Sequence, residues 1–587
     1  MREVRQSAVL YSAVPPDGEQ ERRLREFACR EAGEEIDLVW KESGEYPGGF
    51  RLEIGSKVYD WSLDGRMEQL YRALRETGSA EVQDRIPLLR ETLRNWTPEA
   101  YATEVGTVLT VGDGIATVGG LPGAAYGEIL LFEGGVRGMA QNLNVNEAGC
   151  VLFDDDGEVT SGSRVTRTGR RAGIPVGDCL LGRVINSLGV PIDGGGELGE
   201  TADYYPVERP APSITDRQPV NRPMETGILA IDAMFPIGRG QRELIIGDRQ
   251  TGKTAIALDT ILNQKGKNVI CVYVSIGQKS SSVAKLVQTL RERGAMDYTV
   301  VLHASASESA PMQYIAPYAG CAVGEYFMDR GRDVLVVYDD LSKHAVAYRS
   351  LSLLLGRSPG REAYPGDVFY LHSRLLERAA HLSNARGGGS MTALPIVETQ
   401  VGDVSAYIPT NIISITDGQI FLESELFFAG QRPAVNVGLS VSRVGGDAQT
   451  RAMKSAVGTL RLELAQYREM KIFTQFASEL DEETRKLLHF GGGLMQLLRQ
   501  GQGESMRQYE QVVLLVAALN RAFVPVPERD IRRYAGEFLH WFGEEHPEIC
   551  GRIEGSGVLS AQDRAEICSV AAGYVAAHPC EPLTAGR

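Results

Sequence analysis

The most constraining feature of this 587-residue sequence is the stretch LIIGDRQTGKT at residues 244–254. An apolar run leads into the pattern G-x-x-x-x-G-K-T, and apolar side chains then recur at helical spacing. Glycines let a loop curl so that several backbone N–H groups point inward, and the following helix presents its positive N-terminal end to an anion. The stretch therefore predicts a strand, a phosphate-binding loop and a helix.

Two residues at the end of this loop have specific predicted roles. Lys253 is expected to reach the β- and γ-phosphates of a nucleotide, and the hydroxyl of Thr254 to ligate Mg²⁺. A glycine turn with an incidental lysine is the alternative interpretation. The strand pattern before the loop and the helix pattern after it favour the nucleotide site.

The segments after the loop alternate between strand and helix patterns, which predicts a parallel α/β sheet. Residues 269–276 are almost continuously apolar, as in strands that are covered on both faces. Residues 334–338 form a similar run that ends in Asp339 and Asp340. A carboxylate at the C-terminal end of a buried strand is well placed to hold Mg²⁺ through a water. We predict this role for Asp339 and a structural role for Asp340.

The rest of the chain predicts a multidomain α/β protein. Residues 1–75 mix strand-like and helix-like runs, which indicates a small α+β module, and residues 76–98 indicate a helical linker. Residues 99–170 contain short β-rich runs between glycine turns, with residues 165–168 closing a small β-barrel. Residues 171–450 would form the P-loop nucleotide-binding domain, and residues 451–587 a mostly helical domain.

Composition excludes several classes of protein. The formal net charge of −15 argues against a nucleic-acid partner, which would favour a basic face. The eight cysteines include no C-x-x-C pair, so the sequence predicts free thiols in a cytoplasmic compartment rather than disulfides or a zinc site. The longest apolar run, residues 512–519, is too short to span a bilayer, so any membrane association is expected to go through partners.

Four stretches resemble the alpha subunit of F-type ATP synthases: residues 236–254, 338–343, 359–369 and 433–445. The resemblance runs from about residue 100 to about residue 525 and fades beyond that point. It implies a regulatory subunit of a proton-translocating ATP synthase, in an alternating ring with beta subunits around a central gamma subunit. It also implies a location on the cytoplasmic face of a bacterial cell membrane, reached only through the complex.

The resemblance implies nucleotide contacts residue by residue. The phosphates of a non-catalytic Mg-ATP or Mg-ADP would be cradled by Gly247, Asp248, Arg249, Gln250, Thr251, Gly252, Lys253 and Thr254. Gln278 and Asp339 would lie beside the Mg²⁺. Arg432, Gln500 and Gln502 would flank the adenine.

Three further residues are implied to act on a neighbouring subunit. Arg443 would be an arginine finger that reaches into the catalytic site of a beta subunit, with the hydroxyls of Ser414 and Ser440 near it. An arginine at such a seam neutralises charge that develops on the transferred phosphoryl group. The alternatives are an ordinary surface arginine and plain structural hydroxyls.

Gln278 decides whether this chain hydrolyses ATP. Attack on the γ-phosphate requires a group that orients and polarises water, and catalytic subunits of rotary ATPases carry a glutamate at the corresponding place. An amide is a very poor base, and no Asp or Glu lies between Ser275 and Arg291 to replace it. We therefore expect bound nucleotide with little or no turnover. Because glutamine positions water in some GTPases, this argument holds within the family resemblance.

Residues 12–15, 48–55, 58–63 and 66–74 resemble the C-terminal part of the ATP synthase delta subunit. In that family, this part couples the head to the b subunits of the peripheral stalk. We expect the helical domain that precedes it in delta subunits to be absent. The alternative is an unrelated α+β adaptor. A head with three alpha chains would carry three such modules, whereas related complexes need one.

Two other functions remain open from the sequence. One is a self-sufficient hexameric motor, such as a secretion ATPase or a termination helicase. The acidic composition weighs against the helicase and Gln278 against the secretion ATPase. The other is an unassembled adaptor that only binds nucleotide.

Overall fold

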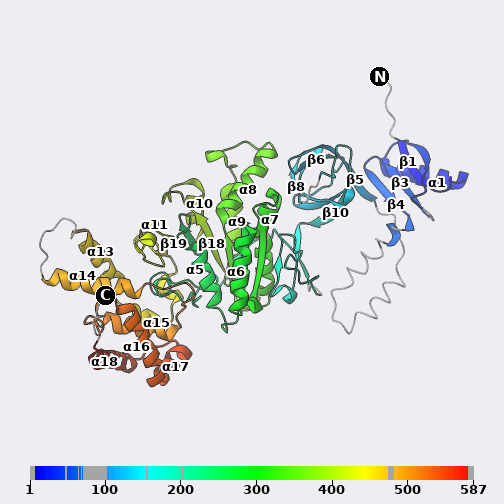
Figure 1. Ribbon diagram of the computed structural model, residues 1–587. Coiled ribbons are helices and arrows are strands. Elements are labelled where there is room, and N and C mark those ends of the chain that lie inside the picture. The colour runs from blue at the N-terminus through cyan, green and yellow to red at the C-terminus, as the bar shows by residue number, and fades with distance from the viewer. Residues whose placement is uncertain are drawn as a thin grey trace. The chain divides into compact units, whose positions relative to one another are not determined.

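The computed structural model describes residues 7–46, 49–63, 65–67, 69, 102–153, 157–199, 203–473 and 482–579 (Figure 1). Clustering of contacts divides the chain into two compact units, Met1–Ala172 and Gly173–Arg587. The helical linker predicted at residues 76–98 lies outside the described residues, as does most of residues 66–74, where the sequence pattern also predicts a helix.

The first unit begins with a small α+β fold, as the sequence predicted. Its elements are β1 (Ser7–Ser12), α1 (Gly18–Ala32), β2 (Asp37–Glu42), β3 (Phe50–Ile54) and β4 (Lys57–Asp60). Strand β1 pairs with β2 in parallel and with β3 antiparallel, and β3 pairs with β4. The Asp17 carboxylate caps the first turn of α1, and Gly33 ends the helix with a φ of 74°. Ala28 of α1 packs with Leu10 and Leu52 in the core of this fold.

Six strands of the first unit close into a β-barrel. They are β5 (Ala102–Gly112), β6 (Ile115–Gly119), β7 (Glu128–Phe132), β8 (Arg137–Leu143), β9 (Glu147–Leu152) and β10 (Arg164–Arg171). The order is β10-β7-β8-β9-β6-β5, and pairing of β10 with β5 completes the ring. The prediction that residues 165–168 close a barrel is therefore confirmed. The β-rich runs that predict strands here are residues 105–111, 115–118, 129–132, 139–143 and 165–168, and they do not include β9.

The second unit contains an eight-stranded sheet in the order β12-β16-β15-β17-β18-β14-β19-β20. Its strands are β12 (Val184–Ile185), β14 (Leu244–Gly247), β15 (Val269–Gln278), β16 (Thr299–Ser305), β17 (Asp333–Asp339), β18 (Ser390–Glu398), β19 (Gly418–Leu422) and β20 (Val441–Ser442). All neighbouring strands are parallel except β19 and β20. A separate antiparallel pair consists of β11 (Gly173–Val176) and β13 (Asp203–Pro206). The predicted parallel α/β domain is thus confirmed.

Helices cover both faces of this sheet, as Figure 1 shows for the central part of the molecule. The helices of this part are α4 (Leu229–Met234), α5 (Lys253–Leu262), α6 (Ser280–Glu292), α7 (Ala310–Met328), α8 (Leu341–Leu354), α9 (Val368–Leu376), α10 (Tyr407–Ile415) and α11 (Ser424–Phe428). Tyr273 and Val337 share a hydrophobic cluster with α5 and α6. The opposite face carries α7, where a Cβ on Gly320 would lie 2.2 Å from Val274. Glycine at this position therefore permits the close approach of α7 to the sheet.

The C-terminal part is helical, as predicted. It consists of α12 (Arg451–Val457), α13 (Leu460–Phe473), α14 (Glu482–Leu497), α15 (Gln508–Leu519), α16 (Ile531–Glu545), α17 (Pro547–Ser556) and α18 (Ala561–Ala577). Helix α15 is almost completely buried and packs against α12, α16, α17 and α18. Residues 512–519 of α15 are apolar on every side of the helix, rather than along one stripe, which explains why it forms the centre of this bundle.

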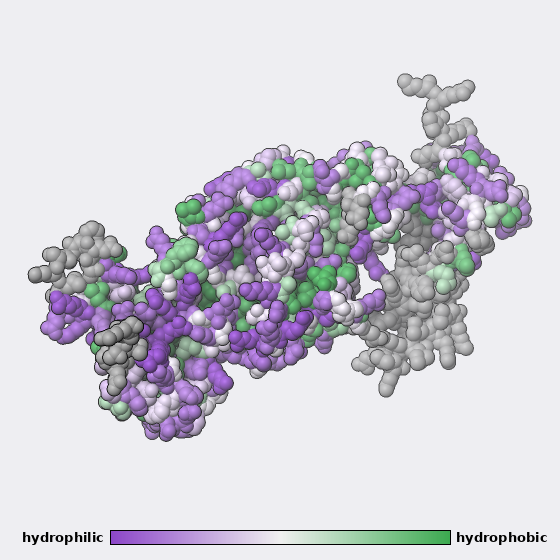
Figure 2. Space-filling model, in the orientation of Figure 1, coloured by the Kyte–Doolittle hydropathy of each residue, from purple (hydrophilic) through white to green (hydrophobic). Residues whose placement is uncertain are grey.

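The surface shown in Figure 2 is mainly hydrophilic, with hydrophobic side chains in small groups. Among the described residues, no helix is both long enough and apolar enough to cross a membrane. The seven cysteines in the described ranges are free thiols, in line with the lack of C-x-x-C spacing.

We expect Phe538→Ala to destabilise the C-terminal helices strongly. Phe538 of α16 is completely buried, and its ring packs against Phe523, Phe542 and Tyr574. Truncating such a ring costs about 3–5 kcal/mol, from lost apolar burial and the cavity left behind. Calorimetry on the full chain should show a transition shifted to lower temperature. Leu462→Ala is the control because that side chain is 57% exposed, and an equal shift for both variants would contradict this packing.

Candidate functional site

The glycine-rich loop connects β14 to α5 and lies at an interior position of the parallel sheet, since β14 pairs with β18 and β19. Two loop residues have left-handed backbone conformations, Gln250 with a φ of 62° and Gly252 with a φ of 97°. Gly247 is required by packing, because a Cβ there would lie 2.5 Å from the carbonyl oxygen of Leu422. The loop therefore has the tight curl that the sequence predicted, and it ends at the N-terminus of a ten-residue helix.

Lys253 is folded over this loop rather than extended into solvent. Its side chain is buried, and Nζ donates hydrogen bonds to the carbonyl oxygens of Gly247 at 2.8 Å and Asp248 at 2.5 Å. Burial lowers the pKa of the Lys253 ammonium, although nearby carboxylates, including Asp339, act in the opposite direction. The ammonium group thus lies where an anion bound by the loop would meet it.

The Asp339 carboxylate is the centre of the polar contacts below the loop. It lies at the end of β17, is 3% exposed, and accepts three hydrogen bonds. Thr254 Oγ1 and Tyr273 Oη each donate to Oδ2 at 2.7 Å, and Gln278 Nε2 donates to Oδ1 at 3.1 Å. The structure therefore brings together Thr254, Gln278 and Asp339, the three residues that the sequence analysis assigned to the surroundings of a Mg²⁺ ion. Oxygen ligands of this kind suit a hard divalent cation.

Asp340 has a different position from Asp339. Its side chain is 1% exposed, and Oδ1 accepts a hydrogen bond from the backbone N–H of Lys343 at 2.8 Å. Asp340 is therefore the N-cap of α8, and Lys343 Nζ lies 3.4 Å from its other oxygen. Burial raises the pKa of Asp340 to about 6. These contacts agree with the structural role predicted for this residue.

Contacts from outside the motif hold the loop in place. The Asp248 carboxylate accepts hydrogen bonds from Thr399 Oγ1 at 2.6 Å, the backbone N–H of Gly402 at 2.8 Å and Ser424 Oγ at 2.9 Å. Arg249 is 83% exposed and pairs with Glu398 at 3.1 Å. Residues just after β18 and at the start of α11 thus bind the Asp248 side chain. Of the two loop side chains, Asp248 and Arg249, the exposed Arg249 is the more accessible.

The residues predicted beside the adenine lie in a second group. The backbone N–H of Gln500 donates to the carbonyl oxygen of Arg432 at 2.7 Å, so these two positions are adjacent. The Arg432 guanidinium lies over the ring of Phe427, 4.4 Å from its centroid. A Cβ on Gly252 would lie 3.8 Å from the Phe427 ring, which links this group to the phosphate loop. Gln502 is exposed and lies in the same turn as Gln500.

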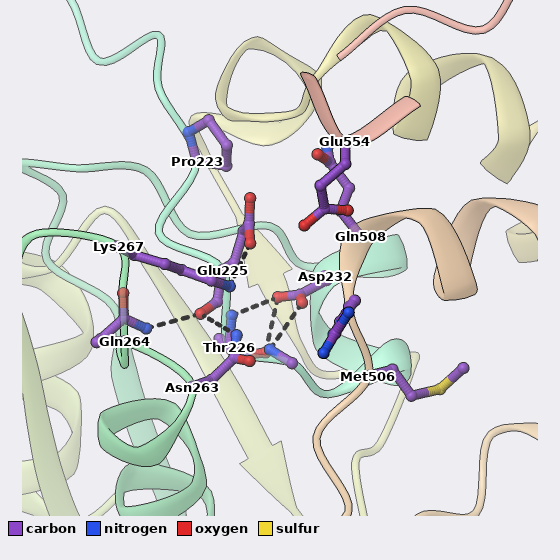
Figure 3. Close-up of polar contacts among 12 residues, drawn as sticks. Pro223, Glu225, Thr226, Asp232, Asn263, Gln264, Lys267, Met506, Gln508 and Glu554 are labelled. Atoms are coloured by element: carbon purple, nitrogen blue, oxygen red, sulfur yellow. Dashed lines mark hydrogen bonds and ion pairs between the residues drawn. The ribbon is translucent and has the colours of Figure 1, made fainter. Parts of the chain in front are cut away.

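A polar network joins the nucleotide-binding part to the C-terminal helices (Figure 3). The buried Asp232 carboxylate accepts hydrogen bonds from Thr226 Oγ1 at 2.7 Å and from Gln511 Nε2 of α15 at 2.9 Å. The neighbouring Glu225 pairs with Lys267, and its carbonyl oxygen accepts from Asn263 Nδ2 at 2.9 Å. The network thereby fixes the chain just before α4 against α5 and α15.

This fixed segment holds the turn that contains Gln500. The carbonyl oxygen of Gly227 accepts from Gln500 Nε2 at 2.7 Å and from the backbone N–H of Met506 at 2.9 Å. Gln500 Oε1 also accepts from the backbone N–H of Leu229 at 3.0 Å. The side-chain amide of Gln500 therefore positions the turn. The backbone of the turn, rather than this amide, contacts Arg432.

Comparison with known protein families gives matches over most of the chain. The ATP synthase alpha/beta family matches with its beta-barrel domain at residues 102–169, its nucleotide-binding domain at residues 227–442 and its C-terminal domain at residues 449–574. The ATP synthase delta (OSCP) subunit family matches residues 2–74.

Individual proteins that are similar to most of this chain agree with these family matches. ATP synthase subunit alpha of Acetivibrio thermocellus is 60% identical over 476 residues, which cover 81% of this chain and 94% of the relative. The alpha subunit of Clostridium kluyveri is 58% identical over 473 residues, which cover 81% and 94% of the two chains. This chain belongs to the ATP synthase alpha/beta family.

The family match corrects one expectation from the sequence. The ATP synthase alpha/beta C-terminal domain continues to residue 574, so the expectation that the resemblance fades after about residue 525 is wrong. The additional segment forms α16, α17 and α18, which pack on α15. Helical packing tolerates many apolar substitutions when volume and pattern are kept, which explains why single motifs do not reveal this part.

The three residues that the resemblance to ATP synthase alpha subunits assigned to a neighbouring catalytic site make their hydrogen bonds outside residues 247–254. Arg443 follows β20, is exposed, and makes no ion pair within 4.0 Å among the described residues. Ser414 is exposed on α10 and donates to the carbonyl oxygen of Asn411 at 2.7 Å. Ser440 is buried, and its hydroxyl accepts from the backbone N–H of Phe421 at 3.0 Å. The structure therefore leaves Arg443 accessible and engages both serine hydroxyls in local contacts.

Sequence reasoning missed two groups that shape this alpha/beta-family site. Tyr273 is the one hydroxyl within the apolar run 269–274, and that single polar atom was the available signal. The Asp248 contacts come from residues about 150 to 180 positions later, and no local pattern marks them.

We expect Asp259→Asn to stabilise the nucleotide-binding part increasingly as the pH rises from about 4 to about 7. Asp259 of α5 is buried and accepts a hydrogen bond from the backbone N–H of Gly503 at 3.0 Å. Burial raises the pKa of Asp259 to about 6 from its ordinary value of 3.8. The folded state binds the Asp259 proton more tightly than the unfolded state does. The free energy of unfolding of the unsubstituted protein therefore falls as the pH rises from 3.8 through 6. Asparagine keeps the acceptor and carries no charge.

Paired calorimetric scans of parent and variant across this pH range check the expectation. Asp447→Asn is the control, since that side chain is 81% exposed. A stability difference between parent and Asp259→Asn that does not change with pH would show that the carboxylate is not destabilised by burial.

Proposed function

We propose that this chain is a regulatory subunit of a proton-translocating F-type ATP synthase that binds nucleotide without hydrolysing it. The observation that carries the proposal is the amide of Gln278 beside Asp339. The catalytic subunits that this family resembles carry a glutamate at that place, which orients and polarises the attacking water, whereas an amide is a very poor base. The role agrees with the alpha-subunit relatives, whose names describe ATP synthase subunits.

The proposed ligand is Mg-ATP or Mg-ADP. The loop from Gly247 to Thr254 would bind the phosphates through its backbone N–H groups, with Lys253 as the cation. Thr254 would ligate the Mg²⁺ directly and Asp339 through a water, and Gln278 would hold Asp339 in orientation. Bound Mg²⁺ would offset the charge of the phosphates. Arg432 with the turn at residues 500–502 would flank the adenine.

Arg443 is the proposed contribution of this chain to catalysis. Arg443 is exposed and forms no ion pair within 4.0 Å in the described ranges, although its charge acts on the buried Glu243 carboxylate, so a neighbouring subunit can reach it. In an alternating ring with beta subunits it would act as an arginine finger in the beta catalytic site. Ser414 and Ser440 are proposed only as nearby hydroxyls, and their present hydrogen bonds favour the structural alternative.

The proposed partners follow from the two kinds of family match. Residues 102–574 would assemble with beta subunits around a central gamma subunit. The delta-type module at residues 1–75 would bind the b subunits of a peripheral stalk. The complex would sit on the cytoplasmic face of the cell membrane, and this chain would reach the membrane through its partners.

The first test is Mg-ATP hydrolysis by the purified chain, alone and mixed with a beta-type subunit. We expect bound nucleotide without turnover for the chain alone, and turnover in the mixture. Arg443→Ala should lower that turnover by about 10³-fold or more, because an arginine finger contributes about 10³–10⁵ to the rate.

Arg451→Ala is the matched control, since Arg451 is also exposed and lies eight positions further on at the start of α12. Robust hydrolysis by the chain alone would overturn the non-catalytic role and favour a self-sufficient motor. Equal turnover with Arg443→Ala and Arg451→Ala would overturn the arginine finger.

Lys253→Ala separates nucleotide binding by this chain from catalysis at the neighbouring site. We expect its own nucleotide affinity to fall about 10- to 100-fold, the value of a lost hydrogen bond to a charged group. Turnover in the mixture should change much less than with Arg443→Ala. Calorimetric titration with Mg-ADP and the hydrolysis assay measure the two effects, and exposed Lys265→Ala is the control. A parallel loss of turnover would contradict a non-catalytic site.

A further inference from the structure

The sheet of the N-terminal module continues directly into the barrel. Strand β4 pairs antiparallel with β5, in the register Lys57–Glu104, Val58–Thr103 and Tyr59–Ala102. The backbone N–H of Val105 also donates to the carbonyl oxygen of Ser56 at 2.8 Å. Strands of the module and of the barrel therefore belong to one ten-stranded sheet within the first compact unit.

We propose that the delta-type module is fixed to its own barrel through this strand pairing, and does not hang from a flexible connection. The N-terminal end of β5 is the docking edge, and β4 is its partner. The proposal concerns how the module is held. Only its consequence for the stalk rests on the function proposed above.

The length of β5 makes this docking edge available. Strand β5 has 11 residues, and its pairing with β10 involves Val105 to Thr107. The three residues before Val105 lie beyond the pairing of β5 with β6, which begins at Thr107, and they pair with β4 on that edge instead. An extended strand with free backbone groups is a template for a further strand, and here the template is covered by the same chain.

Charged side chains support the same register. Arg164 of β10 pairs with Glu53 of β3 at 3.2 Å, which joins the barrel to the module across the two intervening strands. Glu53 is only 20% exposed and also lies 3.3 Å from Arg51. On the neighbouring strands, Lys57 and Glu104 are directly opposite and have opposite charges, although Lys57 Nζ lies 3.6 Å from Glu31 and Glu104 pairs with Arg167 of β10 at 3.0 Å. Opposite charges at facing positions favour one register over a shifted one.

The pairing has a consequence for the proposed stalk connection. If the module binds a peripheral stalk, force from the stalk would pass through the β4–β5 ladder into the barrel. A shared sheet resists sliding through several hydrogen bonds at once, whereas a free segment transmits force only when it is fully extended. Each chain would then carry its own fixed module.

Disulfide formation between introduced cysteines tests the proposal on the full-length chain. The bond from Val105 to Ser56 makes that pair a hydrogen-bonded one, so Lys57 and Glu104 form the adjacent non-hydrogen-bonded pair, whose side chains lie closest. We expect Lys57→Cys with Glu104→Cys to oxidise about tenfold faster or more than unregistered pairs, because docking raises the effective concentration of the two thiols. Peptide mass spectrometry identifies the bond against the native thiols.

Two unregistered pairs are the controls. One combines Lys57→Cys with Val145→Cys, a barrel position that is 92% exposed, and the other combines Lys41→Cys of β2 with Glu104→Cys. A swinging module would oxidise all three pairs at similar rates, and that result would overturn the proposal. Rapid oxidation of Lys57→Cys with Glu104→Cys alone would support it.

Hydrogen exchange of the unmodified chain gives a second measurement that needs no variant. The Val105 amide should be protected, since its hydrogen bond to Ser56 exists only when β4 is docked. Arg164→Glu should reduce that protection by placing like charges together. Full exchange at Val105 in a chain whose Val108 amide stays protected would overturn the docking. Neither outcome depends on hydrolysis or on Arg443, so failure here is distinguishable from failure of the proposed function.

Discussion

The nucleotide-binding part of this protein depends on one carboxylate, that of Asp339. Its position at the end of β17, between β15 and β18, is set by the central pairing of the sheet. From there it accepts hydrogen bonds from Thr254 at the start of α5 and from Tyr273 and Gln278 on β15. A buried carboxylate without such donors would be costly, so the three donors and the acid stabilise one another. These hydrogen bonds therefore fix the positions of the phosphate loop, α5 and β15 relative to one another.

The same contacts fit the nucleotide-holding, non-hydrolytic site that we propose. Three donors occupy Asp339, and the proposed function gives this carboxylate a role in orientation rather than in proton transfer. Gln278 reaches it because an amide donates a hydrogen bond, which an ionised glutamate at the same position would not do. A glutamate there would instead repel Asp339 and turn toward a bound water. Glutamine in place of glutamate at position 278 therefore changes both the hydrogen bonds to Asp339 and the chemistry proposed for the site.

The sequence predicted those features that local patterns encode. The P-loop, the acid pair after an apolar strand and the glycine-punctuated barrel each depend on residues within about ten positions of one another. The unexpected strand β9 contains Gly149 and Cys150, which weaken the polar–apolar alternation that identifies strands. The ties to Asp248 and the adjacency of Arg432 and Gln500 come from segments that only the tertiary fold brings together. Such contacts have no period or spacing in the sequence, and for the adenine side only the family resemblance indicated them.

The junction between β4 and β5 shows why joining two modules in one chain does not by itself define their relation. A connecting segment limits how far the two parts can separate but leaves their orientation free. An antiparallel ladder fixes orientation as well, because a shift by one residue would turn every side chain of the added strand to the opposite face. Tyr59 on β4 is buried in the module core, so such a shift would expose it. The burial of this one ring thereby connects the core packing of the module to its register on the barrel.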